Sequence, residues 1–302
     1  MGHTMKKNLK AYVDLTRLHF FFVWPTLFCS GLFFAYHFYN GFSFPSIIRA
    51  ALIGFLGFEA GLILNDIVDA EVDKKDVEYD KLTKYWRPFG KRPLSQGLIS
   101  KKSALLLFGF FVALTTILIL TLPFPNAVYV LTIMVVCYCL EIFYQVKKRH
   151  ENFPFAQLIG RIDFTLFPVA GYLTLGSPDI NALLFALFFY PLAMAHLGVN
   201  DLIDETNDRA RGLNTVPTLY GMTRTIYWIL FFSIIHFVAT VIFLTVLGAV
   251  ALVGFAFSIS LITIGNYVVL KGKSAAAGLK ALPLFHVAML VYAVAIIIDF
   301  IV

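Results

Sequence analysis

The sequence GVNDLIDETNDRARG (Gly198–Gly212) follows an apolar run that is long enough to cross a membrane. It places Asn200, Asp204 and Asp208 at intervals of four residues. A step of four residues turns an α-helix by only about 40°, so these side chains are expected to share one narrow helical face. Polar side chains of this kind are costly in a bilayer, which indicates that they line the membrane surface or a polar cavity.

An earlier stretch, LNDIVDAEVDKKD (Leu64–Asp76), repeats the pattern at the end of another apolar run. It carries Asn65, Asp69 and Asp73 with the same spacing. Crowded carboxylates repel one another unless a cation lies between them, and hard oxygen ligands favour Mg²⁺. Two opposed faces would hold two Mg²⁺ ions with space for a diphosphate. A solvated acidic surface would explain the charges but seldom keeps this spacing twice. A duplicated fold without function in these loops could preserve the spacing and is the alternative.

The composition defines an integral membrane protein. The chain has 302 residues, of which 59% are hydrophobic and 14% charged, and its mean hydropathy is +0.80. The three cysteines, Cys29, Cys137 and Cys139, lie in apolar stretches and are expected to be buried thiols, not disulfide or zinc ligands. The opening MGHTM (residues 1–5) is expected to be a vector-derived leader, with Met5 as the native start.

Nine apolar stretches are expected to span the membrane. They are residues 18–39, 45–65, 102–122, 125–144, 155–175, 180–200, 223–245, 247–270 and 280–301. The predicted fold is therefore one all-α integral membrane domain over residues 1–302. It consists of two pseudo-repeated four-helix halves, about residues 11–144 and 155–270, and a ninth helix. Both motifs leave on the same face, so the halves should be related by an axis along the membrane normal.

The basic residues predict the orientation. With nine spans, the N-terminus lies on the same side as the loops after the second, fourth, sixth and eighth spans. These segments and the adjoining helix ends hold 23 of the 24 Lys and Arg residues, all except Arg49. By the positive-inside rule, the N-terminus and the active-site loops are cytoplasmic in a multi-pass protein of the cell membrane.

A diphosphate also needs cationic partners, and the same face supplies them. KYWRPFGKRPLSQG (Lys84–Gly97) follows the first motif, and YQVKKRHEN (Tyr144–Asn152) ends the fourth span. Lys and Arg can clamp phosphate oxygens and offset the charge that develops as diphosphate leaves. Membrane topology alone would also place some basic residues here.

Several charged residues lie near or within the predicted spans. Arg17 precedes the first span and Arg161 lies inside the fifth, and a charged residue at membrane depth usually has a partner. Glu59, Glu141 and Asp163 are the acidic residues that raise the same question. The sequence does not show which of them pair.

These residues make the chain similar to the UbiA superfamily of intramembrane prenyltransferases over nearly its whole length. NDxxDxxxD (Asn65–Asp73) and DxxxD (Asp204–Asp208) match the two acidic motifs of that superfamily. The segments KRPLSQG (Lys91–Gly97), YQVKKR (Tyr144–Arg149) and QLIG (Gln157–Gly160) resemble its smaller motifs, in the same order.

The resemblance implies an enzyme, an intramembrane polyprenyltransferase with two Mg²⁺ ions. Its donor would be a polyprenyl diphosphate, whose prenyl group passes as an allylic cation to a lipophilic or aromatic acceptor. The implied metal ligands, to which the spacing adds Asn200, are Asn65, Asp69, Asp73, Asp204 and Asp208, and the four aspartates carry the catalytic role. The implied diphosphate contacts are Arg17, Arg92, Tyr144, Lys148 and Arg149.

Two departures from the family leave roles open. The stretch between Asp73 and Arg92 is longer than in many members, so no role follows for Lys84, Arg87 or Lys91. Gln145 stands where aromatic-acid prenyltransferases often have proline.

The acceptor is suggested by the second motif. NDLIDETNDRARGLNT (Asn200–Thr215) is similar to the NNxRDxxxDRxxGxxT pattern of the menaquinone-forming branch, with Asp201 and Ile203 as differences. The predicted acceptor is therefore an aromatic quinone precursor such as 1,4-dihydroxy-2-naphthoate, with no base identified. The first motif is nearer to archaeal enzymes of ether-lipid synthesis, so geranylgeranyl transfer to geranylgeranylglyceryl phosphate is the alternative.

Two other classes of membrane protein are less consistent with the sequence. A divalent-cation transporter should carry acidic residues facing one another in mid-span, without a basic belt. CDP-alcohol phosphotransferases use a single glycine-containing aspartate motif, and this chain has two motifs without that glycine. Besides the bilayer and the two substrates, no nucleic acid is expected as a partner, and no protein partner can be inferred.

Overall fold

The computed structural model describes residues 2–302, with side chains from Leu9 onward. The leader predicted at residues 1–5 begins at Met1, outside the described residues, and the structure does not test it. All regular secondary structure within residues 2–302 is helical, which confirms the predicted all-α class.

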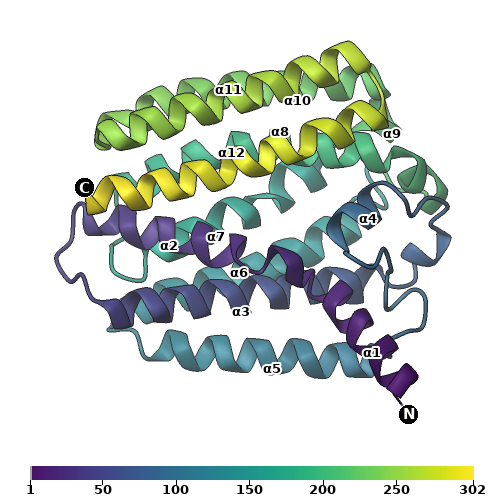
Figure 1. Cartoon of the computed structure of the whole chain (residues 1–302), viewed down its shortest axis with the longest axis horizontal. Coiled ribbons are helices and arrows are strands. Elements are labelled where there is room, and N and C mark those ends of the chain that lie inside the picture. The colour runs from purple at the N-terminus through teal and green to yellow at the C-terminus, as the bar shows by residue number, and fades with distance from the viewer. Residues whose placement is uncertain (1) are drawn as a thin grey trace.

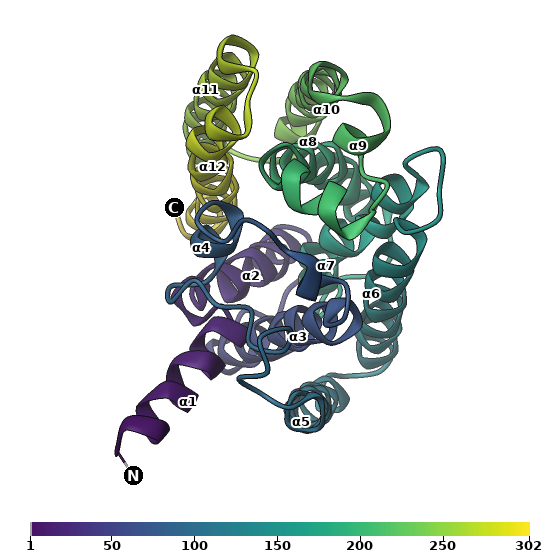
Figure 2. The ribbon, with the colours of Figure 1, turned by 90° about the vertical axis from the view of Figure 1, so that its right-hand side faces the viewer.

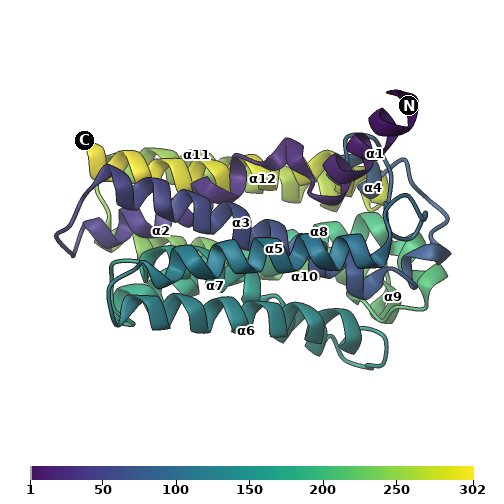
Figure 3. The same cartoon turned by 90° about the horizontal axis from the view of Figure 1, so that it is seen from below.

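Eight helices of the described chain are long and apolar enough to cross a membrane. They are α2 (Val23–Tyr36, preceded by the 3₁₀ turn Leu18–Phe20), α3 (Phe44–Asp69), α5 (Lys101–Leu120), α6 (Asn126–Lys147), α8 (Ile180–Arg211), α10 (Met222–Phe243), α11 (Ala249–Gly272) and α12 (Ala275–Ile301). They run side by side in one bundle (Figure 1; Figure 3). The protein is therefore a multi-pass membrane protein.

The fifth predicted span, residues 155–175, is not one long helix. It starts as a π-helical turn, η3 (Ala156–Gly160), and continues after Arg161 as the short helix α7 (Ile162–Tyr172). Helix α7 packs against α2, α6 and α8, so other helices and not lipid surround much of it. The predicted count of nine spans is therefore not confirmed, and the pseudo-repeat of the two halves stays a prediction.

Helices α2 and α7 approach closely because each has a glycine where they meet. A Cβ atom on Gly31 would lie 2.0 Å from the carbonyl oxygen of Pro168, and one on Gly171 would lie 1.8 Å from that of Phe28. Small residues of this kind allow membrane helices to pack backbone against backbone. The contact fixes α7, whose first turn carries charged residues toward the site described below.

The remaining short helices gather at one end of the bundle, away from the C-terminus (Figure 1; Figure 2). They are α1 (Gly2–Leu15), α4 (Leu82–Trp86) and α9 (Val216–Tyr220). Both acidic motifs lie at this end, where α3 stops at Asp69 and α8 stops at Arg211. Gly212 then takes the left-handed conformation (φ 72°) that commonly closes a helix.

One expectation about the first motif is wrong. Helix α3 ends at Asp69, so Asp73 does not share its helical face and lies instead in the 3₁₀ turn η2 (Asp73–Lys75). Tertiary pairing explains the difference, because Asp73 contacts an arginine of the following loop, as described below. The second motif does lie on one continuous helix, as expected.

The expectation of buried cysteines is correct only for Cys29. Cys137 is half-buried and Cys139 is exposed, and all three are free thiols. Both of these residues lie on α6, where Cys137 borders an internal cavity and Cys139 lies on the outer surface, on which an apolar thiol is tolerated.

Candidate active site

Both acidic motifs border one cavity of about 230 Å³ at the end of the bundle that carries the short helices. Among its wall residues are Arg17, Asn65, Asp69, Asp73, Arg92, Tyr144, Lys148, Asn200, Asp204 and Asp208. The predicted site residues are thus brought together from distant parts of the chain. Arg149 is not one of the wall residues, but it forms an ion pair with Asp69, which is.

Asp69 joins the end of α3 to the end of α6. Lys148 Nζ lies 2.9 Å from Asp69 Oδ2, and Arg149 Nη2 lies 2.8 Å from Oδ1. Arg149 also donates a hydrogen bond of 3.0 Å to the backbone carbonyl of Val68. The two basic residues predicted to contact diphosphate therefore neutralise a predicted metal ligand in this structure.

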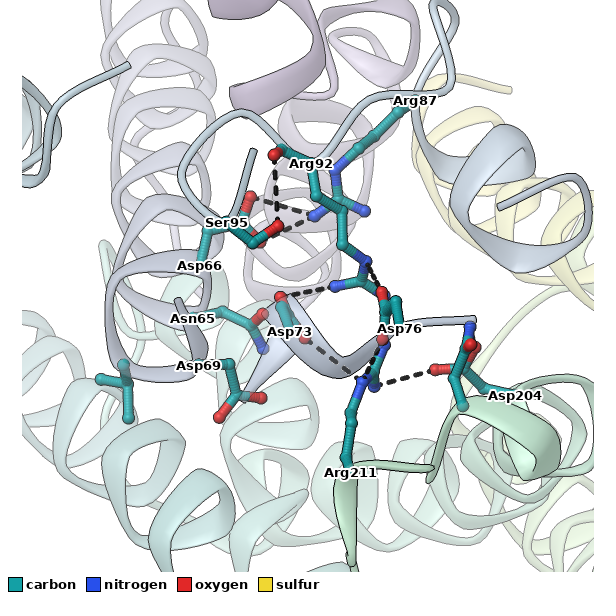
Figure 4. A network of polar contacts seen from close by, with 12 residues as sticks. Asn65, Asp66, Asp69, Asp73, Asp76, Arg87, Arg92, Ser95, Asp204 and Arg211 are labelled. Carbon is teal, nitrogen blue, oxygen red and sulfur yellow. Dashed lines mark hydrogen bonds and ion pairs between the residues drawn. The ribbon is translucent and has the colours of Figure 1, made fainter. Parts of the chain in front are cut away.

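Asp73 is held by the loop that follows it. Arg92 Nη1 lies 2.7 Å from Asp73 Oδ2, and Arg92 Nε lies 2.6 Å from Asp76 Oδ2 (Figure 4). Burial alone would raise the pKa of Asp73, but the attraction of Arg92 and Arg211 outweighs it and holds this pKa below its usual value. Asp73 is therefore ionised at neutral pH.

Arg211 connects the two motifs, and the sequence analysis did not single it out. Its Nη1 lies 3.1 Å from Asp204 Oδ2, and its Nε lies 3.5 Å from Asp73 Oδ1 (Figure 4). The same Nη1 lies 3.5 Å from Asp208 Oδ1. Arg211 also pairs with Asp76. A helical signal was present, since steps of four and three residues place Asp204, Asp208 and Arg211 on one face of α8.

Asp66 holds two arginines of the cavity wall, and the sequence did not reveal this role. Its carboxylate accepts hydrogen bonds from Arg17 Nη2 at 3.0 Å and from Arg87 Nη2 at 2.8 Å. Arg17 has a left-handed backbone (φ 47°, ψ 41°), which is unfavourable for a residue with a Cβ atom. The pair with Asp66 holds Arg17 in this conformation, with its side chain in the cavity wall.

The two asparagines of the motifs differ in what their amide groups contact. Asn65 Nδ2 donates to Glu141 Oε1 at 2.7 Å, which leaves the carbonyl oxygen as the potential metal ligand. Asn200 Oδ1 instead accepts a hydrogen bond of 3.2 Å from Trp86 Nε1, and its Nδ2 donates to the backbone carbonyl of His196 at 3.2 Å. The geometry thus favours Asn65 over Asn200 as a ligand.

The pairing of the charged residues at membrane depth can now be stated. Arg161 Nη2 lies 2.7 Å from Glu141 Oε2, and Arg161 Nη1 lies 3.5 Å from Asp163 Oδ2. Arg17 pairs with Asp66 instead of Glu59. Glu59 is fully buried, and both of its carboxylate oxygens lack a hydrogen-bond partner among the described residues.

The residues of the cavity fit magnesium by their chemistry. Within residues 2–302, no three His, Cys, Asp or Glu side chains are grouped closely enough to hold an ion without rearrangement. The reason is that the motif aspartates described above face Arg or Lys. Their hard oxygens are nevertheless the ligands that Mg²⁺ prefers, and the buried Oδ1 of Asp73 accepts no hydrogen bond.

The charges of the cavity wall are nearly balanced. Its acidic residues are Asp69, Asp73, Asp201, Asp204 and Asp208, and its basic residues are Arg17, Arg87, Arg92, Lys148, Arg161 and Arg211. A magnesium diphosphate brings both signs of charge. Carboxylates can therefore turn to the metal while guanidinium and ammonium groups turn to the phosphates, and no buried charge is left unpaired.

Comparison with known proteins identifies the family. The model of the UbiA prenyltransferase family matches residues 22–297. The chain therefore belongs to the UbiA prenyltransferase family, as the sequence motifs predicted, and its homologues are intramembrane prenyltransferases. Family membership also argues against the cation-transporter alternative.

Two curated relatives differ in their acceptors. The chain is 28% identical over 193 residues to digeranylgeranylglyceryl phosphate synthase of Thermococcus kodakarensis, covering 64% of this chain and 63% of that protein. It is also 28% identical over 224 residues to 4-hydroxybenzoate octaprenyltransferase of Shewanella halifaxensis, covering 72% and 71%. The match thus spans somewhat less than two thirds of the first of these relatives.

Solved structures share the fold. A UbiA homologue from Aeropyrum pernix K1 has a TM-score of 0.74 at 20% identity, with 93% of this chain and 98% of that chain covered. A UbiA homologue from Archaeoglobus fulgidus bound to GPP and Mg²⁺ has a TM-score of 0.70 at 17% identity, with 95% and 99% covered. That homologue supports the use of a divalent metal in this fold.

The bridging role of Arg211 predicts a metal-dependent stability. Arg211→Gln should destabilise the metal-free protein by roughly 3–5 kcal/mol, because buried carboxylates of both motifs lose a shared cation. Added Mg²⁺ should restore part of this loss. Arg209→Gln is the matched control, since Arg209 is exposed and, among the described residues, pairs only with Glu205. Thermal unfolding in detergent, with EDTA and with Mg²⁺, measures the stability of each variant without and with the metal. Equal losses in the two variants, or no effect of Mg²⁺ on Arg211→Gln, would contradict the role.

Proposed function

We propose that the protein transfers a polyprenyl group from a polyprenyl diphosphate to an aromatic acceptor, in a Mg²⁺-dependent reaction that releases diphosphate. The observation that carries this proposal is that both acidic motifs border the same cavity, together with basic residues from the end of α6, from α8 and from the loop after α3. Such a site can bind a metal diphosphate and stabilise it as a leaving group.

The proposed metal site has two sides. Asn65, Asp69 and Asp73 would hold one Mg²⁺, and Asp204 and Asp208 the other, with Asn200 as a further oxygen nearby. When bound, the ions would neutralise the negative charge that develops on the departing diphosphate.

The basic residues exchange partners in this proposal. Lys148 and Arg149 leave Asp69, and Arg92 leaves Asp73, so that each can donate to phosphate oxygens. Arg17 already lines the cavity, and so does Tyr144, whose ring centroid lies 3.8 Å from the guanidinium of Arg161. These donors favour ionisation of the prenyl carbon–oxygen bond because their attraction grows as charge accumulates on the diphosphate.

Aromatic side chains border the inner part of the same cavity. The rings of Trp24 and Phe58 stack with their centroids 3.8 Å apart, and Phe164 lies 6.3 Å from Phe58. Apolar walls keep water from capturing an allylic cation, and the faces of aromatic rings attract a positive charge. The prenyl cation would therefore survive long enough to meet the acceptor.

The choice of acceptor rests on three supports. The second motif is similar to the menaquinone-forming branch, the inner wall is aromatic, and relatives include 4-hydroxybenzoate octaprenyltransferases. The leading candidate is 1,4-dihydroxy-2-naphthoate. Transfer to geranylgeranylglyceryl phosphate is the second candidate, favoured by the first motif and by the similarity to digeranylgeranylglyceryl phosphate synthases.

The active-site end is proposed to face the cytoplasm, because the basic residues gather there. In a variant without its native cysteines, Lys74→Cys should react with an impermeant maleimide only in inverted membrane vesicles. Asn40→Cys, exposed at the opposite end, should react only in right-side-out vesicles. The reversed pattern would overturn the orientation.

Activity measurements test the reaction directly. Purified protein with farnesyl or geranylgeranyl diphosphate and Mg²⁺ should prenylate one member of a panel of 1,4-dihydroxy-2-naphthoate, 4-hydroxybenzoate and geranylgeranylglyceryl phosphate. Asp69→Asn and Asp204→Asn should each lower the rate by about 100-fold or more, since each removes charge from the leaving-group site. Asp80→Asn, at an exposed position in the loop between α3 and α4, should leave the rate unchanged.

The product identifies the acceptor, and the variants test the site. Transfer to the glyceryl phosphate alone would select the second candidate. Consumption of no prenyl diphosphate, or full activity in Asp69→Asn and Asp204→Asn, would refute the proposed reaction.

A further inference from the structure

A second cavity, of about 120 Å³, adjoins the first and lies further from the motif end. It is enclosed by α3, α6 and α7, which pack against one another and lie together in the end-on view of Figure 2. Along α3 it extends from Asn65 to Gly57, a distance of about 12 Å at 1.5 Å per residue. Phe58, Arg161 and Phe164 border both cavities, so a molecule in the second can reach a cation formed in the first.

Glycines on α3 create the space. Gly57 and Gly61 lie one turn apart in the wall, and glycine is unfavourable inside a helix unless close approach or space is needed. A Cβ atom on Gly61 would meet only Tyr138 Cε1, at 3.9 Å. A cavity of about 150 Å³ with apolar walls is enough to bind benzene. At about 120 Å³, the second cavity is somewhat smaller than this and comes close to the size of one aromatic ring.

The polar end of this cavity contains one carboxylate oxygen with capacity for a further hydrogen bond. Glu141 is fully engaged, because it accepts hydrogen bonds from Asn65, Gln145 and Arg161. Asp163 is less engaged, because Oδ1 accepts from the Phe164 backbone N–H at 2.6 Å, whereas Oδ2 has Arg161 Nη1 at 3.5 Å and the carboxyl group lies against that of Glu141. A hydroxyl group in the cavity can donate to this oxygen.

We propose that the second cavity is the acceptor subsite and that it takes one phenolic ring of the acceptor, whose hydroxyl donates a hydrogen bond to Asp163 Oδ2. This inference rests on the proposed prenyl transfer. The ring lies against Phe58 and Phe164, which border the junction of the two cavities. A hydrogen bond to a carboxylate increases the electron density of a phenol, which favours attack on an allylic cation.

The charge of this subsite discriminates between acceptors. Two carboxylates, Glu141 and Asp163, share one guanidinium, that of Arg161, so an anionic group placed at this end, whether a phosphate or the carboxylate of an aromatic acid, would be repelled. A phenolic hydroxyl would be attracted. The polar end of the subsite therefore favours a neutral phenolic hydroxyl over the phosphate of the glyceryl acceptor.

Equilibrium binding tests the subsite without turnover. The full chain in detergent, with Mg²⁺ and pyrophosphate present to fill the first cavity, is titrated with 4-hydroxybenzoate and with 1,4-dihydroxy-2-naphthoate by calorimetry. Gly61→Val, which fills the cavity, and Asp163→Asn, which removes the negative charge, should each raise the Kd for the phenol at least tenfold. Gly109→Val is the matched control, because nothing lies within 4 Å of a Cβ atom there.

Two further titrations separate the possible outcomes. Unchanged affinity for magnesium pyrophosphate in all variants shows that they are folded. Unchanged phenol affinity in Gly61→Val and Asp163→Asn overturns the subsite, and so does a selective loss of geranylgeranyl diphosphate affinity, which would assign the cavity to the prenyl tail. If the wild type binds magnesium pyrophosphate but no phenol, the subsite is wrong and the donor chemistry stands. If it binds neither, the proposed function fails as well.

Discussion

The pairing of buried carboxylates with guanidinium and ammonium groups is the constraint on which the motif end of this protein depends. A charge that is removed from water without a partner is strongly destabilising. Arg211 meets this requirement for both motifs at once, because it contacts Asp204 and Asp208 on its own helix and Asp73 on the loop after α3. Lys148 and Arg149 do the same for Asp69. The two halves of the chain are therefore joined through the groups that the proposed chemistry needs.

The apolar helices serve to bring these charges to one place. Helix α8 crosses the bundle as an apolar segment and then continues as a polar helix, while α3 stops at Asp69 and lets the chain turn back toward the cavity. The close contact of α2 and α7 fixes the helix that begins beside Arg161. The result is a polar cavity next to a smaller one with aromatic walls, which is the combination that the proposed metal diphosphate and the proposed phenolic acceptor require.

Much of this arrangement could be predicted from the sequence, because membrane helices have a strong hydrophobic signal and the repeated aspartate spacing is unusual. That information located the motifs, the basic residues beside them and the family. It did not locate Arg211 or Asp66, since the choice of partner for a charge depends on how loops fold over helix ends. It also placed Asp73 on a helix, because local periodicity carries no information about the tertiary pair with Arg92 that draws it into a turn. Nor did apolar length reveal that residues 155–175 would divide into a π-turn and a short helix.

The central claim is that the two motifs form one site in which metal and diphosphate replace internal ion pairs together. The most direct test is calorimetric titration of the purified protein with Mg²⁺, in the presence and absence of pyrophosphate. The account predicts that each ligand binds weakly alone and much more tightly with the other, and that Asp69→Asn and Asp204→Asn each abolish this cooperativity. Tight Mg²⁺ binding without pyrophosphate, or cooperativity that persists when either motif is altered, would contradict it.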